Sequence, residues 1–249
     1  MIEEKKYNDS FQLSNIQLEI HPGETTLLLG HNGSGKTTII KSLFGLTPYK
    51  GRFLLDNQVI EYKHKHSIDE IKQNISFISD DPSLFYFLTP MEYLNLQKSS
   101  LNKKRDEHYL AILLSLFQFE QYMNVPMENL SYGNKKKIQI IAQLARKPKY
   151  IIIDEPTNGL DPDMVIILKK LLLKLKENGM GMLLSTHNLR FGEELMDRVM
   201  ILKDGCLLLN MKKSEIIKTY HTSNMEQIYK SVNAHYYEAV EEIIDEINI

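Results

Sequence analysis

One segment constrains the fold of this chain more than any other: Gly30-His31-Asn32-Gly33-Ser34-Gly35-Lys36-Thr37. It fits G-x-x-x-x-G-K-[ST] at every position, and its glycines let several backbone N–H groups converge on one anion. The apolar run 24–30 before it predicts a buried strand, and the run 37–45, closed by Gly45, predicts a helix. Strand, loop and helix in this order are the setting that a phosphate-binding loop requires.

A second segment, "YIIIDEP" at 150–156, supplies the acids that such a loop needs. Its apolar residues place Asp154 at the carboxyl end of a strand, where the ligands of open α/β sheets gather. We expect Lys36 to reach the β- and γ-phosphates, and Thr37 and Asp154 to serve Mg²⁺, the aspartate through the water shell of the ion. Glu155 comes next, and a carboxylate there is suited to orient and polarise an attacking water.

The rest of the chain alternates strand-like and helical segments, which predicts an α/β fold with a mainly parallel sheet covered on both faces. Residues 83–145 carry helical spacing and predict a helical subdomain inserted between strands. A helix is expected at 164–178, and strands are expected at 15–23, 24–30, 51–60, 74–80, 149–154, 181–186 and 197–209. We expect four parts: the first part of the core with antiparallel strands (1–82), the helical subdomain (83–145), the second part of the core (146–212) and a helical tail (213–249).

The composition narrows the class of protein. The 249 residues include 30 basic and 32 acidic side chains, a formal net charge of −2, which argues against a nucleic-acid binder that relies on a bulk basic surface. Cys206 is the one cysteine, so no disulfide forms within the chain. The N-terminal residues are unlike a secretory signal, and lysines interrupt the aliphatic run 165–176. We therefore expect the chain neither to enter nor to cross a membrane by itself.

An ordered set of segments resembles the nucleotide-binding subunit of an ATP-binding-cassette (ABC) transporter. The set comprises the loop at 30–38, the helical insertion, "LSYGN" at 130–134, "IIIDEP", "GLD" at 159–161 and "STH" at 185–187. The resemblance runs from about Tyr7 to Tyr229 and implies a P-loop NTPase (RecA-like) core that binds and hydrolyses ATP with Mg²⁺. In this family "LSYGN" is the signature sequence, which implies that Ser131 and Gly133 cap the ATP held by a second subunit, identical or related.

The resemblance assigns roles to further positions of this sequence. Lys36, Glu155 and His187 become the catalytic residues, with His187 as a γ-phosphate contact, and Thr38 joins the nucleotide site with the loop. Asp161 resembles an aspartate that communicates across the dimer. Tyr7 stands where the family places an aromatic ring against adenine, although a half-buried tyrosine at a strand end fits the same pattern. A histidine after a strand, taken alone, is also an ordinary polar loop residue.

Three positions depart from the family's pattern. Asp80 aligns with the glutamine that usually ends the strand before the helical insertion, Tyr132 replaces a common glycine of the signature, and Asn134 replaces its usual glutamine. An aspartate at position 80 can approach Mg²⁺ or its water, and the alternative is that it simply begins a turn with the next two residues. We expect the signature to function because its phosphate-facing residues are retained.

The resemblance also implies an integral membrane permease as partner, so the chain is expected in the cytoplasm, peripheral on the inner face of the cell membrane. Phe85, Tyr86 and Phe87 lie where the family receives its membrane subunit, and local burial explains such a cluster equally well. The stretch 225–232 resembles exporter-type subunits and points to export of a peptide, drug or lipid. The alternative is a non-transport ABC-type ATPase acting as a nucleotide-dependent switch, although coiled coils or a second cassette are missing. A GTPase switch would need the guanine-reading motif N-K-x-D, and "NKKK" at 134–137 lacks its aspartate.

The segment 237–249 predicts an amphipathic helix with an acidic face. Val240, Ile243, Ile244 and Ile247 share its apolar side. We expect this side to pack on the chain's own domain, and the alternative is a contact surface for a partner or a second copy.

Overall fold

The computed structural model describes residues 1–8, 11–82, 85–100 and 105–247. Its centre is a sheet with the strand order β11-β10-β3-β9-β8-β7, in which β11 is antiparallel to β10 and the remaining neighbours are parallel. This is the mainly parallel α/β sheet expected from the sequence. Its strands are β3 (Thr25–Leu29), β7 (Ile75–Ile78), β8 (Tyr150–Asp154), β9 (Gly181–Thr186), β10 (Arg198–Lys203) and β11 (Cys206–Lys212).

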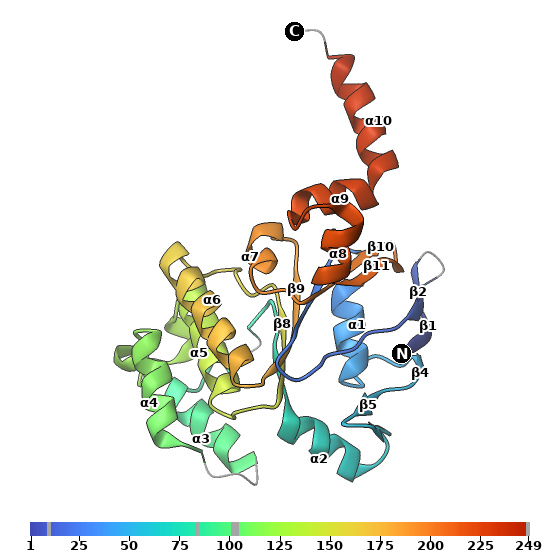
Figure 1. Ribbon diagram of the computed structural model, residues 1–249. Coiled ribbons are helices and arrows are strands. Elements are labelled where there is room, and N and C mark those ends of the chain that lie inside the picture. Colours follow the sequence, from blue (N-terminus) through green and yellow to red (C-terminus); the bar gives the residue numbers. More distant parts are fainter. Residues whose placement is uncertain (9–10, 83–84, 101–104, 248–249) are drawn as a thin grey trace.

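The apolar central strands bury both of their faces because helices cover the sheet on each side (Figure 1). Successive side chains of a strand point to opposite faces. Leu28 and Ile152 accordingly pack with Ile39 and Ile40 of α1 (Lys36–Leu43), whereas their strand neighbours belong to a separate core. That second core takes Leu168 and Leu172 of α6 (Pro162–Glu177), together with Leu27, Leu29, Ile151 and Ile153.

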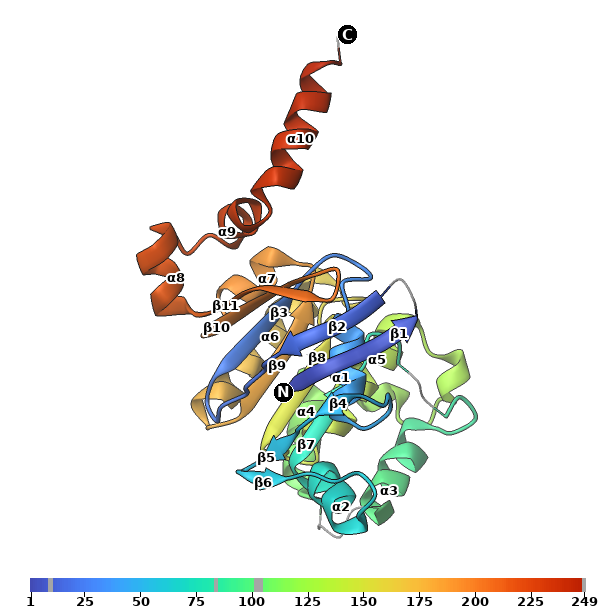
Figure 2. The ribbon, with the colours of Figure 1, turned by 90° about the vertical axis from the view of Figure 1, so that its right-hand side faces the viewer.

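A small antiparallel sheet lies beside α1 and has the order β2-β1-β4, formed by β1 (Ile2–Asn8), β2 (Phe11–Ile16) and β4 (Lys50–Gly51) (Figure 2). The strand expected at 15–23 is therefore wrong beyond Ile16. Ile16 pairs with Ile2 at the beginning of β1, so the residues after Ile16 have no neighbouring strand to bond with. The alternating pattern of residues 18–20 instead reflects burial against the central sheet.

Two further segments differ from the expected strands. The run 51–60 breaks into the short hairpin of β5 (Leu54–Leu55) and β6 (Gln58–Val59), because Asp56 and Asn57 turn the chain with φ of 49° and 66°. The run 197–209 is likewise two strands, β10 and β11, joined at Asp204 and Gly205. A helix that the sequence analysis did not predict, α2 (Lys65–Asn74), precedes β7.

The helical insertion comprises α3 (Pro90–Ser100), α4 (Glu107–Leu116), the 3₁₀ turns η1 (Glu120–Tyr122) and η2 (Met127–Asn129), and α5 (Tyr132–Leu144). α5 begins after Ser131, whose hydroxyl accepts a hydrogen bond from the Asn134 N–H at 3.2 Å. Such an N-cap satisfies one of the backbone donors that every helix leaves open at its start. Leu113 and Ile141 join the same core as α6, so the insertion is packed onto the central sheet.

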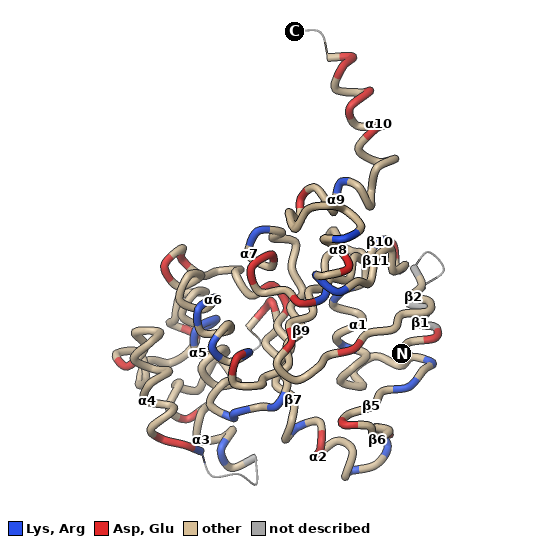
Figure 3. The backbone as a smooth tube through the Cα atoms, viewed as in Figure 1, with Lys and Arg blue, Asp and Glu red and all other residues tan. Residues whose placement is uncertain are grey.

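The chain ends with α7 (Leu189–Glu193), α8 (Lys213–Tyr220), α9 (Met225–Val232) and α10 (Ala234–Asp245). Both views show α10 projecting from the body (Figures 1 and 2), and acidic residues recur along it (Figure 3). None of its residues is buried, and Ile243 is 62% exposed. The expectation that this helix packs on its own domain is wrong, because Met225 and Ile228 of α9 already cover the adjoining core. Among the described residues, no helix is both long enough and apolar enough to span a bilayer.

Candidate nucleotide-binding site

The loop 30–37 connects β3 to α1 in the way that its motif predicted. Gly33 and Gly35 have φ of 87° and 109°, in the left-handed region that a residue with a Cβ rarely adopts. The Ile39 N–H donates to the Gly35 carbonyl at 2.9 Å, so the helix begins directly at the last glycine of the loop. Its open N–H groups and partial positive charge therefore face the loop, which is the physical basis of an anion site.

Lys36 lies in the wall of this loop and is nearly buried, with 6% of its surface exposed. Its Nζ donates to the Gly30 carbonyl at 2.7 Å and to the His31 carbonyl at 3.2 Å. Burial lowers the pKa of Lys36, and the nearby charges of Glu155 and Asp154 work in the opposite direction. An ammonium group held on neutral carbonyls beside two acids is well placed to exchange these partners for phosphate oxygens.

Residues after β10 support the loop from behind, and the sequence analysis did not predict them. His31 Nε2 lies 3.2 Å from Asp204 Oδ1, and the Gly205 N–H donates to the Ser34 carbonyl at 3.0 Å. Ser34 Oγ is buried and has no hydrogen-bond partner within the described structure. The Asp-Gly pair was the available signal, because it marks a tight turn that can approach another backbone closely.

Thr37 and Asp154 meet as the sequence analysis expected, since the Thr37 hydroxyl donates to Asp154 Oδ2 at 2.9 Å. A hydroxyl and a carboxylate are oxygen donors of the kind that Mg²⁺ prefers, and both belong to the wall of the same cavity. Among the described residues, no cluster of three or more His, Cys, Asp and Glu side chains forms a metal cage. This donor set fits Mg²⁺, which usually takes one or two protein ligands and completes its shell with water and phosphate.

Glu155 is held in a conformation that few residues adopt. Its φ is 48°, and its N–H donates to the Ser185 carbonyl at 2.8 Å. The carboxylate is fixed at both oxygens, by the Thr186 hydroxyl at 3.0 Å and by His187 Nδ1 at 2.9 Å. The strained backbone and two side-chain contacts fix the direction of this carboxylate, as a positioned acid or base requires. The sequence analysis named "STH" but gave Thr186 no part.

Lys36, Thr37, Asp154 and Glu155 line one cavity of about 330 Å³. The predicted site residues Gly30, His31, Ser34 and His187 lie outside its wall, and His187 approaches it only through its contact with Glu155. Asp80 belongs to its wall, so this departure from the family's pattern lies in the site rather than in a remote turn. Asn158, which the sequence analysis did not single out, donates from Nδ2 to Asp80 Oδ1 at 2.8 Å. The wall consists of Asn32, Gly33, Gly35, Lys36, Thr37, Thr38, Asp80, Asp154 and Glu155.

Other predicted site residues lie elsewhere. Ser131 and Gly133, at the start of α5, are not part of the cavity wall, and Ser131 is exposed. Asp161 is the N-cap of α6, where its carboxylate accepts from the Met164 N–H at 2.9 Å. Tyr7 belongs to β1, and its side chain is outside the described part of the structure.

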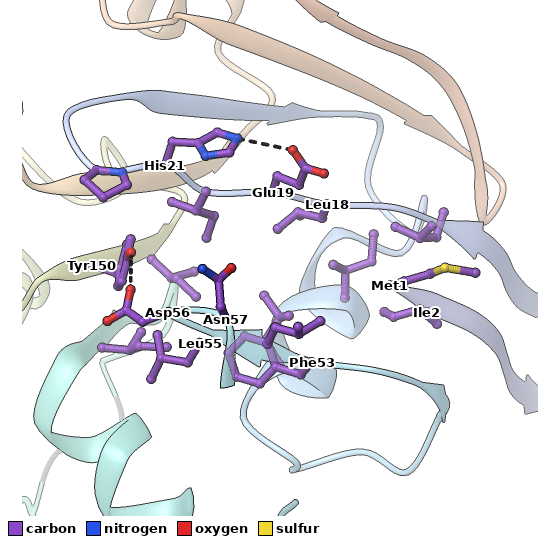
Figure 4. A pocket seen from close by; sticks show the side chains of 18 residues that line it. Met1, Ile2, Leu18, Glu19, His21, Phe53, Leu55, Asp56, Asn57 and Tyr150 are labelled. Carbon is purple, nitrogen blue, oxygen red and sulfur yellow. Dashed lines mark hydrogen bonds and ion pairs between the residues drawn. The ribbon is translucent and has the colours of Figure 1, made fainter. Parts of the chain in front are cut away.

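A second, larger cavity of about 530 Å³ lies between the N-terminal strands and the central sheet (Figure 4). Its wall is mainly aliphatic and includes Ile2, Ile39 and Leu55. Of the polar groups at its edge, Asp56 accepts from the Tyr150 hydroxyl at 2.8 Å, and His21 Nε2 lies 3.2 Å from Glu19 Oε2. A triphosphate needs converging donors, so size alone does not make this larger cavity the nucleotide site.

Comparisons with known proteins agree with this geometry. The sequence model of the family described as "ABC transporter" matches residues 13–158. The energy-coupling factor transporter ATP-binding protein EcfA2 of Clostridium perfringens is 34% identical over 224 residues, covering 86% of this chain and 78% of that protein. The lipopolysaccharide export system ATP-binding protein LptB of Escherichia coli is 28% identical over 225 residues, covering 89% and 92%. A solved ATP-binding subunit of an ABC transporter has a TM-score of 0.84 at 26% identity, covering 93% and 98%.

Proposed function

The chain belongs to the ABC transporter family as an ATP-hydrolysing subunit, and on this premise we propose that ATP joins two such subunits head to tail. The carrying observation is the position of Ser131, which is exposed at the start of α5 and outside the chain's own nucleotide cavity. A helix start is a good anion site only if an anion reaches it. A second protomer, identical or related, brings its bound triphosphate there, and Gly133 lets the backbone come close. Both composite sites then close together under two-fold symmetry.

Within one site the residues divide the work. The loop 30–38 and Lys36 hold the β- and γ-phosphates, while Glu155 orients and polarises the attacking water and His187 contacts the γ-phosphate. Mg²⁺, held through Thr37 and Asp154 with Asp80 beside them, neutralises phosphate charge when it is bound. Asp161 communicates across the dimer, and Tyr7 stacks on adenine. The support for these roles is that the loop, the acids and Asp80 share one cavity.

The cycle follows from these contacts. ATP bound to the loop of one subunit is covered by the signature of the other, which excludes water except at Glu155. Hydrolysis removes the γ-phosphate contact and lets the pair open, so the nucleotide acts as the switch of the dimer. Residues 83–145 move as the helical subdomain that carries the signature, and the core is divided as 1–82 and 146–212, with the tail at 213–249.

The test uses two variants. Glu155→Gln with MgATP should migrate as a dimer in size-exclusion chromatography, because binding is kept and hydrolysis is slowed. Lys36→Ala should remain monomeric under the same conditions, because the triphosphate is no longer held. A Glu155→Gln chain that binds ATP yet stays monomeric at high protein concentration would sink the head-to-tail proposal.

We propose further that this subunit works on the cytoplasmic face of a membrane, bound to an integral membrane permease. Phe85, Tyr86 and Phe87 support this, since all three are exposed and Phe87 is 77% exposed at the surface of the helical subdomain. An exposed aromatic cluster of this kind favours partner contact over local burial. Phe87→Ser should reduce co-purification of the membrane subunit while ATP binding by the isolated chain is retained.

The direction of transport, export or uptake, is a separate proposal. We propose export of a peptide, drug or lipid, and the likeness to the lipopolysaccharide export protein LptB over 89% of the chain supports it. The likeness to the energy-coupling factor protein EcfA2 supports the other direction, uptake. Purification of the chain from membranes with its permease, followed by ATP-driven cargo movement in vesicles of known orientation, decides between them.

A further inference from the structure

Two positions at which this chain departs from the family's pattern contact each other. The hydroxyl of Tyr132 donates to the backbone carbonyl of Asp80 at 3.0 Å, across 52 positions of the sequence. Tyr132 is the first residue of α5, directly after Ser131, and Asp80 lies in the wall of the nucleotide cavity. The contact therefore joins the helix start that faces a second protomer to the cavity of the same chain.

Lys136 strengthens this junction from the next turn of α5. Residues 132 and 136 are one helical turn apart and share a face of the helix. The Nζ of Lys136 donates to the Ser79 carbonyl at 2.7 Å and to the Asp80 carbonyl at 3.2 Å. Its side chain is fully buried and does not belong to the cavity wall. Two donors from one helix face thus hold one carbonyl of the segment that carries Asp80.

The loop after β8 completes the cluster. Asn158 donates to the Asp80 carboxylate, and Gly159, with φ of 76°, lies under the ring of Tyr132. A Cβ added to Gly159 would come within 2.2 Å of two ring carbons of Tyr132, so the ring rests directly on this backbone. The hydroxyl and the ring of Tyr132 thus connect the start of α5 both to Asp80 and to the 158–159 loop.

We propose that Tyr132 and Lys136 are positioning residues, which hold Asp80 and thereby set the orientation of Ser131 according to what the nucleotide cavity contains. This inference rests on the proposed head-to-tail function, because the orientation of Ser131 matters only if it caps a second protomer's ATP. Neither side chain belongs to the cavity wall. Tyr132 acts through Asp80, and Lys136 acts through Asp80 and through Asp154, whose carbonyl also accepts from its Nζ at 3.5 Å. A glycine at position 132 has no side chain, so it could not donate the hydrogen bond that Tyr132 gives to the Asp80 carbonyl.

The first experiment removes only one hydroxyl. In the Glu155→Gln background, Tyr132→Phe should raise the MgATP concentration needed for half-maximal dimerisation by about fivefold, the loss expected for one neutral hydrogen bond. Binding of a fluorescent ATP analogue to the dilute monomer should stay within about twofold of the parent. Tyr122→Phe, which removes a tyrosine hydroxyl from η1 in the same subdomain, is the matched control and should leave both measurements unchanged.

The second experiment follows the transmission itself by hydrogen–deuterium exchange on Glu155→Gln chains diluted until they are monomeric. MgATP should slow exchange at 33–39 and at 132–140 in the parent. In Tyr132→Phe the protection at 33–39 should persist, and the protection at 132–140 should fall by more than half. Lys136→Met should show the same loss, provided that its thermal melting confirms a folded chain.

Three results would overturn the inference: unchanged or tighter dimerisation of Tyr132→Phe, an equal loss of ATP affinity in the monomer, or undiminished protection of 132–140. The last two would reduce Tyr132 to a merely structural residue. If the parent Glu155→Gln chain itself fails to dimerise, the head-to-tail proposal fails first, and the exchange measurement on monomers still reports separately on the link between Asp80 and α5.

Discussion

Lys36 and Lys136 make nearly the same contacts and serve different purposes. Both are buried, both donate to backbone carbonyls, and burial lowers the pKa of each, that of Lys136 to about 8. Lys36 borders a cavity, whereas Lys136 is fully buried between α5 and the ends of β7 and β8, where its Nζ donates to the carbonyls of Ser79 and Asp154. Removing a cation from water costs free energy unless well-placed hydrogen-bond acceptors replace the water, so the desolvation of each lysine must be offset by its contacts.

The difference lies in whether the partners can be exchanged. Lys36 can leave the carbonyls of its loop for a phosphate that enters the cavity, so its cost is offset when ligand binds. Lys136 is fully buried and lies outside the cavity wall, so we expect it to keep its contacts with the Ser79 and Asp80 carbonyls when a ligand binds. The same functional group is thus a ligand-binding group at one place and a structural connection at the other.

The largest effect should come from Lys36→Ala. We expect ATP turnover to fall by about 100-fold or more, as for the loss of a main electrostatic contact to the transferred group. Its unfolding temperature should stay near that of the parent, because Lys36 faces a cavity that water can fill. Turnover by colorimetric phosphate release and melting by differential scanning fluorimetry measure the two quantities. A variant that keeps turnover would contradict the role given to Lys36.

For Lys136→Met we expect the larger effect on stability rather than on ATP turnover. The part-buried carbonyls of Ser79 and Asp80 and the buried carbonyl of Asp154 each lose a donor, so the free energy of unfolding should fall by about 2 kcal/mol. Lys36→Met, the matched control, should cost clearly less. Urea unfolding followed by circular dichroism gives both values, and equal costs for the two lysines would remove the distinction drawn between them.

A smaller effect concerns pH. The pKa of Lys136 is about 8 in the folded chain and near 10.5 when the chain is unfolded. Between these values the unfolded state binds more protons, so the stability that depends on Lys136 rises with pH in this window. The difference in unfolding free energy between the parent and Lys136→Met should therefore grow by about 1.5 kcal/mol from pH 8 to pH 9.5, measured with EDTA present. A constant difference across this range would speak against the assigned titration.

The smallest effect should come from Asp80→Asn, which changes the charge of the cavity wall close to Lys136 and leaves the backbone carbonyl in place. We expect the Mg²⁺ concentration for half-maximal turnover to rise by about threefold, as one partly screened carboxylate near a divalent ion is neutralised. Asp81→Asn, at the next and exposed position, is the control. An unchanged Mg²⁺ dependence of Asp80→Asn would contradict a role of this carboxylate near the ion and would leave only its hydrogen bond with Asn158.

The sequence predicted the residues that serve bound ligand better than those that connect parts of the fold. Lys36, Thr37 and Asp154 could be brought together from the motif and from the rule that parallel strands end at one edge of a sheet. The six-stranded sheet followed from the same alternation, apart from its antiparallel strand β11. These features are local patterns, and local patterns are what a single sequence reports.

The contacts of Lys136 and Tyr132 had no such signal. Lys136 was one of three successive lysines, which usually mark a solvated face, and its burial depends on the path of a segment 56 positions earlier. The hairpin at 54–59 was missed because each of its strands has only two residues. The helix α2 was missed because its residues are mostly polar and only Ile71 is buried. The helix α10 was expected to pack on the domain because an amphipathic pattern predicts an apolar face but does not identify the surface that this face contacts.

Because α10 projects from the body, it is a suitable segment for limited proteolysis, truncation and labelling. Residues 234–245 bury nothing, and apart from the Lys203 ammonium over the Tyr236 ring the structure gives this helix few ties to the body. A twelve-residue helix without tertiary support is marginal in water, so a protease should cut here before it cuts the core. A chain shortened to Asn233 should crystallise more readily, and a fluorophore carried beyond that residue should report on neighbours without disturbing ATP turnover.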